Sequence, residues 1–201
     1  MTLKTNLKFL LKSFIVVSLV SIISCESSDY VPKPKAYLRL QYPDAKYVSQ
    51  NLQLPFYFET NTLANIKFKK VKSSSESYGV NLEYPTLKGT IFLTYKLIDK
   101  DKKNLIDYLR DAQNFTQKHT IKADEIPVTP YQNYERKVYG SLAEVVGDVA
   151  SPAQFYVTDS INHFLTGSLY FYTKPNYDSI LPAANYLQKD IKHIMETIKW
   201  K

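Results

Sequence analysis

A single cysteine, Cys25, is the feature that most restricts how this chain of 201 residues can fold. One thiol excludes an intramolecular disulfide, a CxxC redox motif and a metal site built only from cysteines. The fold must therefore be stabilised by a hydrophobic core. The composition allows this, because 44% apolar and 22% charged residues are ordinary for a globular domain.

The first 24 residues have the pattern of an export signal. Lys4, Lys8 and Lys12 give a basic start without acidic residues, and a nearly unbroken apolar run follows at 14–23. This run is shorter than the about twenty residues that a membrane-spanning helix needs. We therefore expect residues 1–24 to be a signal peptide. Its removal takes away three lysines, so the net charge falls from +7 to +4, and we expect no nucleic-acid partner.

The apolar run ends in a motif that resembles the lipobox of bacterial lipoproteins. Ile22, Ile23 and Ser24 directly precede Cys25. In such a motif the thiol accepts a diacylglyceryl group, and the small residue before it gives the signal peptidase access to the scissile bond. We expect lipidation at Cys25, with acyl chains such as palmitate attaching the protein to a membrane. An ordinary secretory signal with a chance cysteine is the alternative.

The rest of the chain divides into a tether and one domain. Residues 25–45 are expected to form a lipidated tether with an extended segment, because Pro32 and Pro34 favour an extended backbone. Residues 46–201 contain neither an internal repeat nor a block of low complexity, which predicts a single domain.

Short aromatic and β-branched segments dominate the domain and predict strands of an antiparallel sheet. In the first half they cover 54–59, 65–69, 79–84 and 90–97, with a hairpin turn at 85–89. In the second half they cover 139–146, 154–158 and 163–173.

Two helices are expected to pack on this sheet. In the first, at 103–119, one row contains Leu105, Leu109, Ala112 and Thr116. The second is C-terminal, with Asp178 or Ser179 as its cap. Its apolar stripe contains Leu187, Ile191, Ile194, Met195 and Ile198. The predicted fold class is therefore α+β, with helices on the faces of an antiparallel sheet. An α/β/α sandwich of the PsbP or Mog1 kind is one possible arrangement.

Motifs for common catalytic chemistry are absent from the sequence. It has no GxSxG, HExxH, GxxxxGK[ST] or GxGxxG pattern. His119, His163 and His193 are far apart and have no ligand-type residue at a familiar metal spacing. Aspartate-serine pairs at 159–160 and 178–179 are typical of turns and caps. We expect no catalytic residue, no metal and no cofactor.

Aromatic and basic segments allow a binding role as well as a structural one. The 17 tyrosines all follow the signal, and alternating aromatics at 56–58 and 170–172 either fill the core and cover the rim or form a stacking platform for carbohydrate. Lys67 and Lys69 suit a solvated edge strand that resists pairing with other chains. The alternative interpretation is that these lysines contact anionic membrane headgroups.

Several blocks resemble the GldD family of gliding motility lipoproteins of Bacteroidota. They are PKPKAYLRLQYP at 32–43, NLEYP at 81–85, LTYK at 93–96, SPAQF at 151–155, GSLYF at 167–171 and KDIKH at 189–193, in the order of the family. The resemblance implies a cell-envelope lipoprotein that faces the periplasm, is required for gliding, and is connected to type IX protein secretion. It implies no catalytic residue.

The leading hypothesis is a non-enzymatic component or assembly factor of the gliding and type IX secretion machinery that acts through protein contacts. Tyr37, Arg39 and Tyr42 are the candidate partner-binding residues, because arginine among aromatics beside a tether is typical of an interaction hot spot. The alternative for this segment is packing on the domain as a first strand. The alternative function is a lipid-anchored binding module for a small molecule or an envelope glycan.

Overall fold

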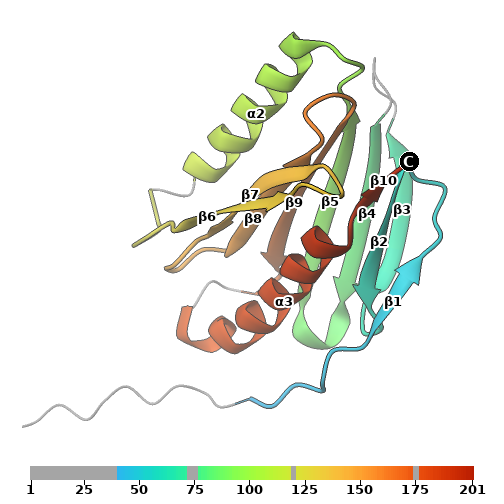
Figure 1. Cartoon of the computed structure of the whole chain (residues 1–201). Helices are drawn as coiled ribbons and strands as arrows, with labels where there is room; N and C mark the ends of the chain where they lie inside the picture. Colours follow the sequence, from blue (N-terminus) through green and yellow to red (C-terminus); the bar gives the residue numbers. More distant parts are fainter. Residues whose placement is uncertain (1–39, 72–76, 119–120, 174–176) are drawn as a thin grey trace, which may run out of the picture. The chain divides into compact units, whose positions relative to one another are not determined.

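The computed structural model describes residues 40–71, 77–118, 121–173 and 177–201, which lie in one compact unit. Figure 1 shows this unit. The predicted signal peptide, the lipobox and Cys25 lie outside the described residues, as do Tyr37, Arg39 and most of the predicted tether. The domain boundaries at 24 and 45 therefore stay predictions.

A seven-stranded antiparallel sheet forms the centre of the described unit. In spatial order its strands are β3 (Asn65–Val71), β4 (Ser77–Tyr84), β5 (Gly89–Leu97), β9 (His163–Phe171), β8 (Ala153–Thr158), β7 (Val138–Glu144) and β6 (Val128–Asn133). Two meanders, β3-β4-β5 and β6-β7-β8-β9, meet where β5 pairs with β9. The short turn η1 (Pro85–Leu87) joins β4 to β5 at the predicted hairpin.

Two helices and a smaller sheet complete the fold, which confirms the α+β class. Helix α2 (Lys102–Gln117) connects the two meanders, and the Asp101 carboxylate caps it by accepting a hydrogen bond from the Lys103 amide at 2.8 Å. Helix α3 (Tyr177–Thr197) leads into β10 (Lys199–Trp200). The smaller sheet has the order β1-β2-β10, with β1 (Tyr47–Gln50) and β2 (Phe56–Asn61).

The hydrophobic core lies between the large sheet and the layer formed by α3 and β2. The predicted stripe from Leu187 to Ile198 is fully buried there. The aromatic residues at 56–58 fill the core on one face and cover the rim on the other, because Phe56 and Phe58 are buried whereas Tyr57 between them is exposed. Strand alternation therefore decides which rings build the core.

The first helix differs from the prediction in its packing. We expected its apolar row to bury against the sheet, but within α2, all of which the structure describes, no residue is buried. The row lies at intermediate exposure instead. The helix stands off the sheet, and this spacing creates the candidate site described below.

Further corrections concern the start of α3 and the short strands. Helix α3 begins at Tyr177, so Asp178 and Ser179 lie in its first turn and are not its cap. Strands β1, β6 and β10 were not predicted. β6 contains Pro130, which an edge strand tolerates because one side of its backbone has no partner. The lysine-rich β3 is an edge strand of the large sheet, as expected.

Candidate functional site

A cavity of about 770 Å³ lies between α2 and the large sheet. Its floor is the face of β5, β9, β8 and β7 that points away from the α3 core. Two rows of cross-strand neighbours form this floor. One row contains Phe92, Ser168, Gln154 and Ala143, and the next contains Thr94, Thr166, Tyr156 and Ser141. The floor thus carries two rings, Phe92 and Tyr156, among mostly neutral polar groups.

Aromatic rings line one side of the cavity. Tyr156 stacks on Phe164 with a centroid distance of 5.7 Å and an interplanar angle of 6°. Tyr108 of α2 packs against the same Phe164 ring at 5.6 Å. Because Phe164 is buried and the two tyrosines are half-buried, the tyrosine rings are the surfaces that a ligand can reach.

The polar groups of the cavity are mostly neutral. Gln154 is only 4% exposed, and neither its amide nitrogen nor its amide oxygen has a partner among the described residues. The lysine in the lining, Lys96, lies over the Tyr108 ring at 4.5 Å and pairs with Asp111 at 3.6 Å. This pair links the sheet to α2 and balances the charge of the site.

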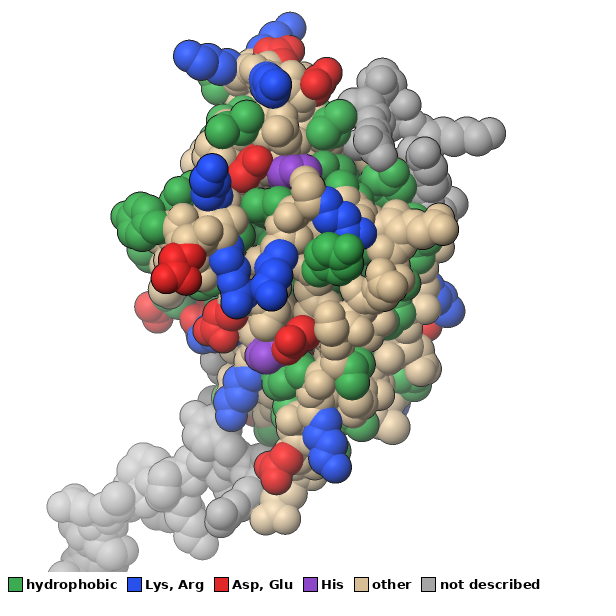
Figure 2. All heavy atoms as spheres, turned by 45° about the vertical axis from the view of Figure 1, so that its right-hand side comes forward, with side chains coloured by type: hydrophobic (Ala, Val, Ile, Leu, Met, Phe, Trp, Pro, Cys, Tyr) green, Lys and Arg blue, Asp and Glu red, His purple; other side chains and the backbone are tan. Residues whose placement is uncertain are grey.

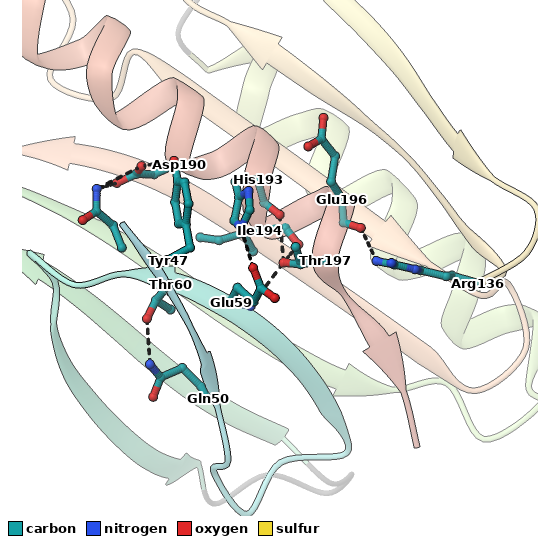
Figure 3. A network of polar contacts seen from close by, with 11 residues as sticks. Tyr47, Gln50, Glu59, Thr60, Arg136, Asp190, His193, Ile194, Glu196 and Thr197 are labelled. Carbon is teal, nitrogen blue, oxygen red and sulfur yellow. Dashed lines mark hydrogen bonds and ion pairs between the residues drawn. The ribbon is translucent and has the colours of Figure 1, made fainter. Parts of the chain in front are cut away.

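A second group of polar side chains joins the N-terminal strands to α3 (Figure 3). We call Tyr47, Asn61, Tyr186 and Asp190 the α3 polar cluster. The Tyr47 hydroxyl donates to an Asp190 carboxylate oxygen at 2.7 Å, and the Asn61 amide donates to the other oxygen at 3.1 Å. The Asn61 amide also donates to the Tyr186 hydroxyl at 3.0 Å. Asp190 is thereby tied to both β1 and β2.

Burial dominates the electrostatics of this cluster. Asp190 is 1% exposed, and loss of hydration raises the pKa of its carboxyl group despite the hydrogen bonds from Tyr47 and Asn61. Burial, followed by the neighbouring Asp190 carboxylate, also raises the pKa of the Tyr47 and Tyr84 hydroxyls. The Tyr84 hydroxyl has no hydrogen-bond partner among the described residues. Both tyrosines therefore stay protonated, and Tyr47 is the one that donates to Asp190.

His193 lies one helical turn from Asp190 and faces the same strands. Its Nε2 is 2.8 Å from a Glu59 carboxylate oxygen, and its ring stacks on Tyr47 at 3.6 Å. The Thr197 hydroxyl accepts from the Glu59 amide at 3.1 Å and donates to the His193 carbonyl at 2.8 Å. The sequence predicts a helix around His193 and gives no sign of its carboxylate partner on β2. The contacts fix β2 against α3.

Of the other two histidines the structure describes His163, which does not join this group. His163 begins β9, and its Nδ1 is 2.8 Å from the Tyr95 hydroxyl, while burial lowers the pKa of the ring. His119 lies outside the described residues. Within the described ranges no three His, Cys, Asp or Glu side chains are placed to hold a metal ion.

Of the candidate partner-binding residues, the structure describes Tyr42. Its ring packs on Tyr186 of α3 at 5.2 Å, and the Tyr186 hydroxyl donates to the Pro43 carbonyl at 3.0 Å. The segment before β1 is thus attached to α3 without being a strand. Partner binding by Tyr37, Arg39 and Tyr42 stays a prediction.

The comparison with known families decides the identity of the chain. The model of the gliding motility lipoprotein GldD family matches residues 27–200. The chain belongs to the GldD family. No curated protein sequence matches it significantly. The match begins two residues after Cys25 and contains every described element, so the cavity and the α3 polar cluster are both parts of a GldD domain.

Membership agrees with the lipoprotein interpretation of the N-terminus. The family is one of lipoproteins that serve gliding motility, which implies a membrane-anchored envelope location. Across the part of the chain that the structure describes, neither helix is sufficiently long and apolar to cross a membrane.

Asp190 is expected to be important for stability. Replacing Asp190 by alanine leaves the Tyr47 hydroxyl and the buried Asn61 amide without their acceptor, so we expect a loss of about 3 kcal/mol in the free energy of unfolding. Urea unfolding followed by circular dichroism measures this. Glu196→Ala removes an exposed carboxylate from the same helix and is expected to change stability by less than about 0.5 kcal/mol. Equal effects of the two variants would contradict this role of Asp190.

Proposed function

We propose that the protein is a non-enzymatic, lipid-anchored component or assembly factor of the gliding and type IX secretion machinery, facing the periplasm and acting through protein contacts. The family match over residues 27–200 is the observation that carries this proposal. The proposed anchor is Cys25, followed by a tether and one folded domain.

The attachment of the N-terminal segment to α3 supports an anchored role. Tyr42, Pro43 and Tyr47 all contact α3, so the chain becomes part of the folded unit at residue 42. Sixteen residues lie between Cys25 and Tyr42, and the chain from one to the other spans at most about 60 Å at full extension. The domain therefore works within that distance of the membrane. Force on the anchor would pass through these contacts directly to α3.

The charge distribution favours recognition by local contacts. On the face shown in Figure 2, basic, acidic and hydrophobic side chains are interspersed. Ion pairs such as Lys67 with Glu83, at 2.9 Å, balance charges locally. Recognition of a protein partner then depends on individual anchor residues rather than on a large field of one sign.

Arg39 is our first choice for such an anchor residue. We expect Arg39→Ala to reduce gliding speed by about tenfold and to remove a partner from pull-downs, since an arginine hot spot contributes about 2 kcal/mol or more. Arg110→Ala is the matched control, because Arg110 is exposed on α2 and pairs with Asp107 of the same helix. Normal motility with unchanged partners in Arg39→Ala would eliminate docking through this residue.

A second candidate function is that of a lipid-anchored binding module for a small molecule or an envelope glycan. It requires a concave site lined by aromatic side chains, and the cavity beneath α2 has Tyr108, Tyr156 and Phe92 in its lining. A binding role is compatible with action in the gliding machinery, because the cavity lies on the face of the sheet opposite the α3 core and its attached N-terminal segment.

A further inference from the structure

The two faces of the large sheet differ in the polarity of their side chains. On the α3 side, Ile91, Leu93 and Leu169 are fully buried in the core. On the α2 side, the intervening positions Thr94, Thr166 and Ser168 carry hydroxyl groups and are half-buried. A helix that only completed a core would meet apolar side chains. Here α2 covers a floor with hydrogen-bonding groups and contributes no buried residue.

Gln154 is the strongest sign of a ligand. Its side chain lies in the middle of the floor, between Ser168 and Ala143 of the neighbouring strands. A buried amide without partners destabilises a fold, and such groups are rare without a reason. Because the amide has both a donor and an acceptor, it can bridge two adjacent groups of a ligand that each donate and accept.

The lining as a whole selects the chemistry of the ligand. A sugar ring has faces made of C–H groups, which pack on aromatic rings, and a rim of hydroxyl groups, which need neutral donors and acceptors. The half-buried Tyr108 and Tyr156 rings suit the C–H faces of a sugar. Gln154 and the threonine and serine hydroxyls suit its hydroxyl rim. A volume of about 770 Å³ is within the range of small-ligand sites and accommodates a short oligosaccharide.

Other ligand classes fit less well. An acyl chain would cover the hydroxyl and amide groups of the floor without satisfying them. An extended peptide would meet the central strands β5, β9 and β8, whose backbone groups already pair with neighbours on both sides. An acidic sugar would find Lys96 already paired with Asp111.

We propose that the cavity between α2 and the large sheet binds a neutral oligosaccharide, with Tyr108 and Tyr156 stacking on sugar rings and the Gln154 amide bridging two adjacent hydroxyl groups. This goes beyond action through protein contacts, because it adds an envelope glycan to what the domain recognises.

The test uses the lipidated full chain in phospholipid nanodiscs with maltotriose and cellotriose as probes. Saturation-transfer NMR detects binding, and calorimetric titration gives the affinity. Trialanine and octanoate serve as peptide and acyl probes. We expect at least one trisaccharide to bind saturably, and Gln154→Leu and Tyr156→Ala each to weaken that binding by about tenfold or more. Tyr156→Phe keeps the ring and is expected to bind nearly as well as the native protein.

Two controls separate binding from folding. Gln53→Leu makes the same substitution at an exposed position and is expected to leave affinity unchanged. Gln154→Leu is expected to melt at or above the native temperature, because it removes a buried amide that lacks partners. If Gln154→Leu fails to fold, Ala112→Phe replaces it as the test variant. The added ring on α2 narrows the cavity from the helix side and must abolish binding.

Three results would overturn the proposal. One is that neither trisaccharide binds. Another is that binding is unchanged in the folded cavity variants. The third is that only octanoate or trialanine binds in a way that these variants abolish. None of these results would remove the proposed gliding role, which is measured in cells.

Discussion

Cys25→Ala is expected to abolish membrane attachment and gliding. The chain has one cysteine, so no other thiol can receive the lipid. Each acyl methylene that inserts into a membrane contributes about 0.8 kcal/mol, and the loss of several acyl chains releases a protein that has no other proposed anchor. Labelled palmitate should no longer be incorporated, the protein should leave the membrane fraction, and cells carrying only this variant should stop gliding.

The matched control for this prediction is Ser27→Ala, which changes a small polar residue just after the lipobox and leaves the thiol in place. It is expected to be labelled and membrane-bound as the native protein is. Palmitate incorporation or membrane retention in Cys25→Ala would contradict lipidation at Cys25. Release from the membrane with normal gliding would instead show that gliding does not require the lipid anchor.

Gly140→Ala is expected to cause the largest loss of stability among single methyl additions. A Cβ at this position in β7 would lie 1.9 Å from the Tyr156 carbonyl oxygen of β8. Backbone atoms cannot move aside without disturbing the pairing of β7 with β8, where Gly140 is opposite Val157. We expect a loss of at least about 3 kcal/mol, a large part of the 5–15 kcal/mol that is typical of a domain.

Gly89→Ala is a matched control for the Gly140 prediction. Its added Cβ would lie 2.9 Å from the Leu187 Cδ1 atom, which is the end of a flexible side chain. Small side-chain shifts can relieve this contact, so we expect a loss of about 1 kcal/mol. Chemical unfolding of both variants measures the difference. If Gly140→Ala were as stable as Gly89→Ala, β7 and β8 would lie farther apart at position 140 than the 1.9 Å contact implies.

The sequence predicted the strands and helices whose apolar patterns are regular. β4, β5 and α3 follow clear alternation or helical spacing, and α3 buries its predicted apolar stripe. β1 was missed because its sequence YVSQ is short and mostly polar, and it is a strand because β2 pairs with it. β10 has only two residues, which is too short for any periodicity to appear.

The candidate sites depended on tertiary structure and were harder to predict. The cavity exists because α2 stands off the sheet, and the row that places Gln154 beside Ser168 depends on strand register. One usable signal was a glutamine within the otherwise mostly apolar strand AQFYVT. Another was Asp190, which lies beside the apolar stripe of α3 and so required a polar partner. The identity of that partner depended on how β1 and β2 pack against the helix.

In-cell crosslinking tests the central claim of a contact function most directly. A photoreactive residue replaces Leu40, an exposed neighbour of Arg39, in gliding cells, and captured proteins are identified by mass spectrometry. The same probe at Ile106, an exposed position of α2, is the control. We predict that the probe at position 40 captures an envelope protein of the gliding or type IX secretion machinery and that the probe at position 106 does not. Capture of no protein at position 40 in cells that glide normally would contradict the account.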